Sequence, residues 1–431
     1  MVEVTSTIVR PRPADGETSA SGSWDPLVRP FAWAFLVAAL VLNSGAITGV
    51  PGFVLPNSVP LLVGLGCMGV ALILPRDRPV VVPLGACGIL VMGVLSLLWS
   101  RDEASSILWL RSNGAVAIGI AALALVLPTT ETVAVLKVYV RVVLAITLVA
   151  VTIEPLARVH VDPLGVSPNL KGWHGYFVHK NVMAAFLIFA LAVVLAFDRN
   201  RWTRWTSVAA ITFLFVVSDS TTGRMAALVL VAVSVWFTTN RRLSGRSSAA
   251  LAASSAALVA VIGVAIGASL SAIADAAGKD LTFTGRTKIW SASWHAVLRD
   301  PIIGHGVNGL FGTPRTPETA AVLREIGFQA GHPHNGLLDV LVQFGFVGAV
   351  LVIGVVVAIL RASIRLQRRS PRYAAFGLCA MSAIVIMSVG ESVFLGSSMA
   401  VMIVLRVLLM REETERPRGV ETAGAGRRRR R

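Results

Sequence analysis

The sequence predicts an all-α protein that crosses a membrane many times. Of its 431 residues, 55% are hydrophobic and only 14% are charged, whereas soluble domains average nearer a quarter charged. Runs of about 18 to 20 apolar residues recur along the chain, and each is long enough to cross the hydrocarbon layer as a helix. The net charge of +16 lies mainly in short loops and the tail. This pattern argues against nucleic-acid binding and indicates orientation in a membrane.

The apolar runs predict about twelve transmembrane helices. Their ranges are 31–50, 57–75, 79–99, 107–127, 132–153, 181–197, 205–218, 223–239, 249–271, 335–360, 373–390 and 392–410. We expect residues 29–410 to form the transmembrane domain, flanked by a disordered cytoplasmic tail at 1–28 and a basic cytoplasmic tail at 411–431. No cleavable signal peptide is expected, because the first apolar run begins only at Phe31.

The positive charges in the loops predict the orientation of the protein in the membrane. With the N-terminus in the cytoplasm, the short arginine-rich loops all fall inside; they are 75–78, 198–204, 240–246 and 361–372. Only the inner loop 128–131 lacks a positive charge. The positive-inside rule then places both termini in the cytoplasm and both long loops, 154–180 and 272–334, outside. The cysteines Cys67, Cys87 and Cys379 lie within apolar spans and are expected to behave as small hydrophobic residues.

The long loop 272–334 concentrates ionisable and aromatic side chains. Residues 286–299 have helical spacing of apolar side chains, with Arg286 in the first turn and Trp290, Trp294, Val297 and Leu298 forming the apolar pattern. This predicts an amphipathic helix on the membrane face that ends at Asp300-Pro301. Gly304-His-Gly-Val-Asn-Gly309 matches a dinucleotide motif by letter only, since no strand precedes it, so we expect a flexible turn. Thr316-Pro317-Glu318 predicts a short helix to about Ile326.

Two histidines, His332 and His334, stand just before span ten, followed by Asn335. A lone histidine at a membrane edge is usually structural. A pair beside an arginine-bearing loop favours proton transfer.

Four further basic residues are candidates for anion binding. His179 and Lys180 precede span six at a helix N-terminus that Asn181 is expected to cap; interfacial anchoring is the simpler alternative. Arg224 follows the hydroxyl-rich turn 218–223, where a snorkelling side chain is the alternative. Arg111 lies inside span four, where a cation is a functional hypothesis by default.

Taken in order, these segments resemble the O-antigen ligase and polysaccharide polymerase superfamily of bacterial envelope enzymes, and more closely its exopolysaccharide-polymerase branch. The residues that carry the resemblance are Trp173-x-Gly175-x-Phe177-x-His179-Lys180-Asn181, the Ser/Thr turn with Arg224, Thr284-Gly-Arg286-x-x-x-Trp290, Asp300-Pro301-Ile-Ile-Gly304-His-Gly306, and His334-Asn335-Gly-Leu-Leu with Phe344-Gly-Phe-Val-Gly348. The resemblance covers roughly residues 60–410.

The resemblance implies a GT-C-like glycosyltransferase. Such an enzyme takes a glycan from a polyprenyl-pyrophosphate carrier at the outer face of the cytoplasmic membrane, without a metal or cofactor. Matched by motif, Arg224 and Arg286 would hold the pyrophosphate and His334 would assist the acceptor. The family's turn usually has its cation directly after a serine, whereas Ser220 is followed by Thr-Thr-Gly-Arg224, which displaces this cation by about a helical turn.

The predicted site therefore comprises a catalytic pair, a pyrophosphate-binding group and a substrate-binding group. The catalytic residues are His334 and Arg286; the pyrophosphate-binding residues are Arg224, Arg286, Arg111 and Lys180; the substrate-binding residues are His179, Trp290, His332 and Asn335. Scattered acids and histidines predict no metal site.

The function expected first is polymerisation of lipid-linked glycan. Ligase-type transfer to a lipid, protein or wall acceptor is the close alternative, and a polysaccharide transporter or flippase, or a scaffold, is the alternative from another class. The expected partners are the lipid-linked donor, a glycan or lipid acceptor, membrane lipid, a flippase and a chain-length regulator.

Overall fold

The computed structural model describes residues 28–74, 82–158, 172–243, 286–311 and 316–414, and these ranges contain helices, turns and loops but no strand. Six helical segments there are long and apolar enough to cross a membrane: 103–126, 129–153, 180–197, 221–240, 336–366 and 371–390. Shorter apolar helices cover 28–44, 58–73 and 84–98. An all-helical protein with several membrane spans is therefore confirmed, while the number twelve stays a prediction.

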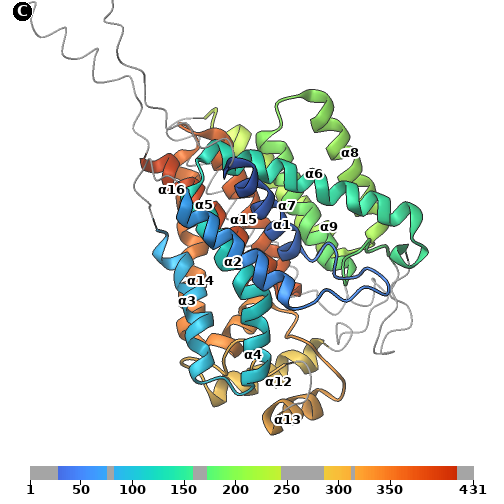
Figure 1. Ribbon diagram of the computed structural model, residues 1–431, viewed down its shortest axis with the longest axis vertical. Coiled ribbons are helices and arrows are strands. Elements are labelled where there is room, and N and C mark those ends of the chain that lie inside the picture. The colour runs from blue at the N-terminus through green and yellow to red at the C-terminus, as the bar shows by residue number, and fades with distance from the viewer. Residues whose placement is uncertain (1–27, 75–81, 159–171, 244–285, 312–315, 415–431) are drawn as a thin grey trace, which may run out of the picture.

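Each predicted span except 249–271, which lies outside the described residues, contains a helix (Figure 1). The helices within the predicted spans are α1 (Val28–Ser44), α2 (Ser58–Ile73), α3 (Leu84–Leu95), α5 (Ala115–Val126), α6 (Thr129–Ile153), α7 (Lys180–Phe197), α8 (Arg201–Ser218), α9 (Thr221–Asn240), α14 (Gly336–Leu366), α15 (Pro371–Gly390) and α16 (Ser397–Thr414). In the described part of the loop predicted at 272–334 lie two α-helices, α12 (Arg286–Arg299) and α13 (Pro317–Ile326). Both have the bounds that the sequence predicts.

Span four is interrupted. The short helix α4 (Glu103–Trp109) begins at an Asp102 cap, whose side chain accepts a hydrogen bond from Ser105 N, and it runs through a π-helical turn, Leu110–Gly114, into α5. One extra residue in such a turn rotates the side chains that follow, and π turns often occur at functional sites. Arg111 lies within this turn and is exposed.

Small residues allow the spans to pack closely. A side chain at Gly64 of α2 would come within 2.4 Å of the Ala115 carbonyl oxygen, and one at Gly119 of α5 within 2.9 Å of the Gly64 carbonyl oxygen. Close backbone approach through small residues is typical of helix pairs in membranes. Cys67 is buried in this contact and Cys379 is buried elsewhere in the core, as expected of small hydrophobic residues.

The loops that the sequence places inside contact one another at one end of the bundle. Arg29 pairs with Glu131, Asn240 donates a hydrogen bond to Gln367 at 3.1 Å, and Arg368 donates one to the Leu243 carbonyl at 3.0 Å. These contacts join segments far apart in the sequence, so the alternation of loops between the two ends is a property of the fold.

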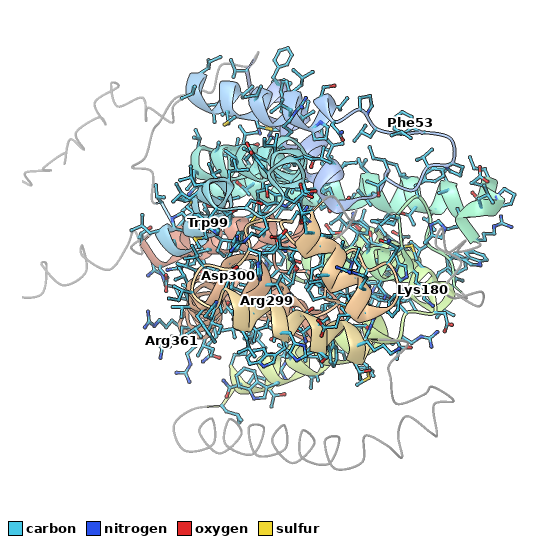
Figure 2. The ribbon with its side chains drawn as sticks, turned by 90° about the horizontal axis from the view of Figure 1, so that it is seen from below. Phe53, Trp99, Lys180, Arg299, Asp300 and Arg361 are labelled. Carbon is cyan, nitrogen blue, oxygen red and sulfur yellow. The ribbon has the colours of Figure 1, made fainter. Side chains whose placement is uncertain are left out.

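The loops that the sequence places outside meet at the opposite end, where α12 and α13 also lie (Figures 1 and 2). Gly49 N donates to the Tyr176 carbonyl at 2.6 Å. Arg101 pairs with Asp300 at 2.9 Å, and Trp99 Nε1 donates to the Ile303 carbonyl at 3.2 Å. An ion pair and a hydrogen bond therefore hold the segment after α12 against the loop after α3.

The glycine-rich segment 304–309 contains the turn that the sequence predicts, and this turn is largely buried against α14. The cause is a break in α14 at Gly345, whose φ of 60° and ψ of −159° are not helical. The interrupted helix leaves backbone groups unpaired, and the turn supplies their partners. His305 N donates to Val342 O at 2.9 Å, Gly306 N to Gln343 O at 3.0 Å, and Phe346 N to Pro301 O at 2.8 Å.

We predict that Gly345→Ala lowers the melting temperature of the detergent-purified protein. The backbone conformation at 345 is accessible essentially to glycine alone, and a side chain in it costs on the order of 1–3 kcal/mol. The added Cβ would also lie 2.3 Å from the Ile302 carbonyl carbon. Gly354→Ala on the same helix is the control, because nothing lies within 4 Å of its Cβ position. Equal melting temperatures for the two variants would contradict this account.

Candidate functional site

The candidate site is built around the carboxylate of Glu391, which lies between α15 and α16. Arg286 Nη2, from the first residue of α12, is 3.0 Å from Glu391 Oε1. His334 Nδ1, from the loop before α14, is 3.4 Å from Glu391 Oε2. The Arg286 and Glu391 side chains are 22% and 12% exposed, so water screens this pair only partly. The structure thus brings the two predicted catalytic residues together on one carboxylate.

Asn181 extends this network into α7 and α9. Its Nδ2 donates to Glu391 Oε1 at 2.5 Å, and its Oδ1 accepts from Ser220 Oγ at 2.8 Å. Ser220 Oγ also accepts from Gly223 N at 3.1 Å and thereby caps α9. Hydroxyl, amide, carboxylate and guanidinium groups therefore form one connected set, and groups in such a set hold one another in position.

The expectation that Asn181 caps α7 was wrong. His179 is the capping residue, and its Nδ1 accepts from Asn181 N at 3.1 Å. The imidazole nitrogen can cap because His179 has extended backbone geometry, which directs the side chain back toward the first helical N–H groups. The Asn181 amide is thus left to contact Glu391 and Ser220.

The two histidines before α14 form a pair whose rings are 4.0 Å apart. His334 has a φ of 51°, and its backbone N–H donates to His332 Nδ1 at 3.2 Å. Trp290 Nε1 donates to the Pro333 carbonyl at 3.0 Å between them. Trp290 thus anchors the histidine loop to α12, and its predicted contact with substrate stays a prediction.

Burial, followed by the nearby positive charge of His334, lowers the pKa of His332 to about 3. His332 is therefore neutral at neutral pH. Because its Nδ1 accepts the His334 N–H, the proton of its neutral ring is assigned to Nε2.

The pKa of Glu391 lies below its usual value of 4.5. Burial acts to raise it, but the hydrogen bond and charge of His334 and the charge of Arg286 lower it by more. The carboxylate is therefore ionised at neutral pH and holds a negative charge between the arginine and the histidine.

Other predicted residues lie outside this network. Arg224 Nη2 pairs with Asp219 at 2.8 Å, and both side chains are about half exposed. Lys180 donates to the Asp219 carbonyl at 3.2 Å. Asn335 caps α14 by accepting from Leu338 N at 3.0 Å, so it has a structural role. Among the described residues, Arg111 makes no ion pair with this network.

His332 lines two cavities, and Glu391 lines one of them. The first, here called the Glu391 cavity, has about 820 Å³ of empty volume, open in part to solvent, and is lined by Asn181, Glu391 and His332 together with apolar residues of α1 and α7. The second, here called the α14 cavity, has about 730 Å³ of empty volume and is lined by His332, Asp339, Gln343 and Trp109 among others. Asn113, His332, Ser392 and Gly396 line both, so the two cavities share a wall.

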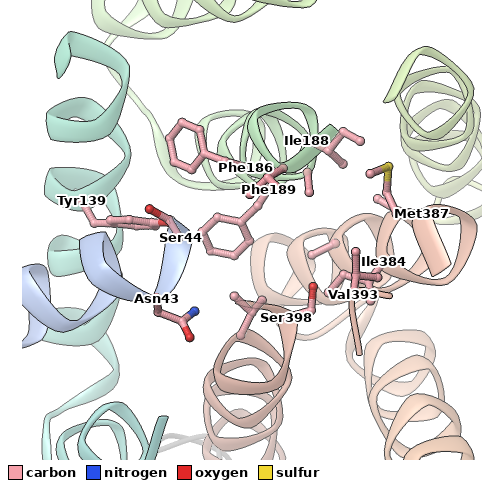
Figure 3. A pocket seen from close by; sticks show the side chains of 15 residues that line it. Asn43, Ser44, Tyr139, Phe186, Ile188, Phe189, Ile384, Met387, Val393 and Ser398 are labelled. Carbon is pink, nitrogen blue, oxygen red and sulfur yellow. The ribbon is translucent and has the colours of Figure 1, made fainter. Parts of the chain in front are cut away.

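A third cavity, here called the apolar cavity, lies between α1, α6, α7, α15 and α16 (Figure 3). It has about 550 Å³ of empty volume, open in part to solvent, and is lined mostly by apolar side chains, including Phe186, Phe189, Ile384 and Met387. Asn43, Ser44, Val182, Ala185 and Val393 line both it and the Glu391 cavity. An apolar compartment therefore adjoins a charged one.

Comparison with known proteins supports the resemblance. Residues 206–353 match the family model described as O-antigen ligase. A region of 212 residues is 27% identical to the exopolysaccharide production protein ExoQ of Rhizobium meliloti (strain 1021), covering 46% of this chain and 47% of that protein. These matches show that the chain is similar to proteins of the O-antigen ligase and polysaccharide polymerase superfamily. The match spans only about half of the curated relative's length.

The O-antigen ligase segment contains Arg224, Arg286 and His334, but it ends before Glu391. Glu391 belongs to none of the sequence motifs, so they did not predict its role. One signal was available: Glu391 is an acid at the border of two apolar runs, 373–390 and 392–410. An ionisable residue in that position is a functional hypothesis by default.

Within the described ranges, no group of three or more His, Cys, Asp and Glu side chains is placed to hold a metal ion.

We predict that Glu391→Gln lowers the melting temperature at neutral pH, because it leaves the half-buried Arg286 without its ion pair; the loss is about 1–3 kcal/mol. The folded-state pKa of Glu391 is depressed, so its stabilisation is complete above the unfolded value of 4.5 and is lost as the pH falls through the lower folded value. The difference between wild type and Glu391→Gln should thus be constant from pH 8 to about pH 5 and shrink below 4.5.

Melting temperatures measured across this pH range check the prediction. Glu103→Gln, an exposed acid in the first turn of α4, is the matched control and should follow the wild type. A Glu391→Gln difference that stays unchanged down to pH 3 would show that the ion pair does not carry the stabilisation.

Proposed function

We propose that this protein is a membrane glycosyltransferase that transfers a glycan from a polyprenyl-pyrophosphate carrier to an acceptor hydroxyl at the outer face of the cytoplasmic membrane. The observation that carries the proposal is the joint position of Arg286 and His334 on Glu391, beside a cavity that continues into an apolar compartment. The relationship to O-antigen ligases supports the same chemistry.

The two adjoining cavities match the two parts of such a donor. The apolar cavity offers phenylalanine, isoleucine and methionine side chains to an isoprenoid chain. The Glu391 cavity is lined by the carboxylate that pairs with Arg286, and a guanidinium fits the geometry of a pyrophosphate. One lipid-linked substrate would therefore occupy both, with its charged group at the outer end of the bundle.

Arg286 would stabilise the leaving group. As the acceptor oxygen bonds to the anomeric carbon, the bond from that carbon to the pyrophosphate oxygen breaks and its electron pair stays on the pyrophosphate. A guanidinium held by Glu391 needs little reorganisation to stabilise that charge. Because Arg286 has five N–H donors, it can contact a pyrophosphate while Glu391 retains one of them.

His334 would accept the proton that the acceptor hydroxyl loses. With Nδ1 facing Glu391, a proton on Nδ1 leaves the lone pair of Nε2 free to act as a general base. Glu391 would then stabilise the imidazolium that forms, as the carboxylate of a catalytic triad does. Proton transfer of this kind typically contributes about 10²- to 10⁴-fold in rate.

Glycan polymerisation is the first choice for the overall reaction, because the curated relative is named for exopolysaccharide production. Ligation to a lipid, protein or wall acceptor is the alternative, because the matched family model is named O-antigen ligase. The arginine-rich loops at the other end of the bundle support an orientation with the site outside and both termini in the cytoplasm.

We predict that Arg286→Ala and His334→Ala each abolish glycan transfer in membranes supplied with the lipid-pyrophosphate glycan, with expression unchanged. Arg286→Ala should also weaken binding of farnesyl pyrophosphate to the purified protein by about tenfold or more, because charge-assisted hydrogen bonds are lost. Arg299→Ala, an exposed arginine at the other end of α12, is the matched control and should behave as the wild type.

Near-wild-type turnover by both variants would overturn the assignment of the site. Substrate movement across the membrane without bond formation, unchanged by His334→Ala, would support a transporter instead.

We also predict that EDTA leaves glycan transfer unchanged, because guanidinium groups take the place of a metal at the pyrophosphate. Transfer measured before and after chelation tests this, and strong inhibition would contradict it.

The glycan profile of a deletion strain separates the two acceptor types. Loss of polymer length with intact anchoring indicates a polymerase, whereas unanchored lipid-linked polymer indicates a ligase.

A further inference from the structure

The α14 cavity has a chemistry different from that of its two neighbours. Its wall combines the aromatic rings of Trp109 and Phe311 with the polar side chains of Asn308, Asp339 and Gln343. Neither this cavity nor the Glu391 cavity has a lysine or arginine among its lining residues, but only the Glu391 cavity is lined by the carboxylate that pairs with Arg286. A pyrophosphate in the α14 cavity would lack that arginine, and an isoprenoid chain would bury the polar groups without partners, which is unfavourable.

The polar groups of this cavity are held in fixed positions. Gln343 Nε2 donates to Asp339 Oδ1 at 2.7 Å, and Gln343 Oε1 accepts from Asn308 N at 2.9 Å. Asp339 and Gln343 are only 5% and 7% exposed. The Gly345 break holds the turn that carries Asn308 against α14. The cavity is thus preorganised, which lowers the entropic cost of binding a ligand.

Two of these groups retain unused capacity for hydrogen bonds. Within the described part of the chain, Asp339 forms no ion pair, and one carboxylate oxygen accepts only the Gln343 bond, although a carboxylate has about four acceptor sites. Ser392 Oγ is buried and has no hydrogen-bond partner among the described residues, and it lines both this cavity and the Glu391 cavity. A buried polar group of this kind is stabilised by a ligand that supplies its partner.

We propose that the α14 cavity binds a neutral sugar unit of the glycan acceptor. A sugar ring presents hydroxyl groups that donate to carboxylate and amide oxygens, and C–H faces that pack on aromatic rings. No lysine or arginine lines the cavity to pair with the carboxylate of an acidic sugar, so a neutral sugar unit fits it better. This inference rests on the proposed function and specifies the acceptor for it.

The position of the cavity fits this role. His332 and Asn113 line both the α14 cavity and the Glu391 cavity, and His332 adjoins His334. An acceptor sugar in the one cavity would therefore meet the pyrophosphate-linked carbon in the other at the histidine pair. The π-helical turn in span four, Leu110–Gly114, contributes Asn113 to this boundary, which gives that irregular turn a function.

The test measures two probes on full-length, detergent-purified protein by titration calorimetry. One is farnesyl pyrophosphate; the other is a set of neutral oligosaccharides from partial acid hydrolysis of the host's own surface polysaccharide. Asp339→Asn replaces an acceptor oxygen by a donor and keeps the oxygen that Gln343 contacts. Asn308→Gly removes an amide at a position whose φ is 51°, which glycine adopts without strain. Each should weaken oligosaccharide binding by about tenfold and leave farnesyl pyrophosphate binding unchanged.

The controls separate the possible failures. Arg286→Ala should show the reverse pattern, and Asn57→Ala, an exposed amide before α2 that forms no side-chain cap, should bind both probes as the wild type does. Unchanged oligosaccharide binding by Asp339→Asn and Asn308→Gly, or no oligosaccharide binding by a wild type that binds farnesyl pyrophosphate, would overturn the sugar subsite alone. Failure of the wild type to bind farnesyl pyrophosphate would overturn the proposed function. Intact farnesyl pyrophosphate binding by both variants shows that they are folded.

Discussion

The ionised carboxylate of Glu391 is the interaction on which the candidate site depends. It lies where α7, α12 and the loop before α14 converge, and it contacts one side chain from each: Asn181, Arg286 and His334. A guanidinium with little access to water is costly unless a carboxylate compensates it. The ion pair between Arg286 and Glu391 therefore helps to hold together segments that are distant in the sequence.

The same carboxylate sets a chemical constraint. Glu391 occupies part of the hydrogen-bonding capacity of Arg286, so the anionic substrate of the proposed function would share the guanidinium with it. This contact would keep Arg286 ordered before that substrate arrives, and an ordered group stabilises developing charge better than a mobile one. Glu391 also contacts His334 through Nδ1, which in the proposed function leaves Nε2 to face the acceptor hydroxyl.

A second constraint comes from the backbone. The break at Gly345 exposes helix N–H and C=O groups that the turn after α12 then pairs. These hydrogen bonds hold the turn after α12 against α14. They bring Asn308 into contact with Gln343, and both residues line the α14 cavity. The charged network and the cavity are thus organised by different forces, an ion pair in one case and backbone hydrogen bonds in the other, yet they meet at His332.

Local patterns in the sequence determined the helices. The apolar runs predicted the spans within the described residues, and the spacing of residues 286–299 and the Thr316-Pro317 cap predicted α12 and α13 with their observed bounds. These features depend on neighbours a few residues apart, so periodicity and capping suffice to find them. The choice of Arg286 and His334 as a pair came from motifs, and the structure places them together.

Only the tertiary structure decided how the site is assembled. Glu391 stands 57 residues from His334 and 105 from Arg286, and no spacing rule connects them. The residue that caps the N-terminus of α7 is His179 and not Asn181. Arg224 pairs with Asp219, its near neighbour in the sequence. Sequence periodicity specifies which face of a helix is apolar. Which polar groups meet depends instead on how the helices pack. A buried charge needs a partner, because leaving it unpaired is costly, and that partner can lie anywhere in the chain.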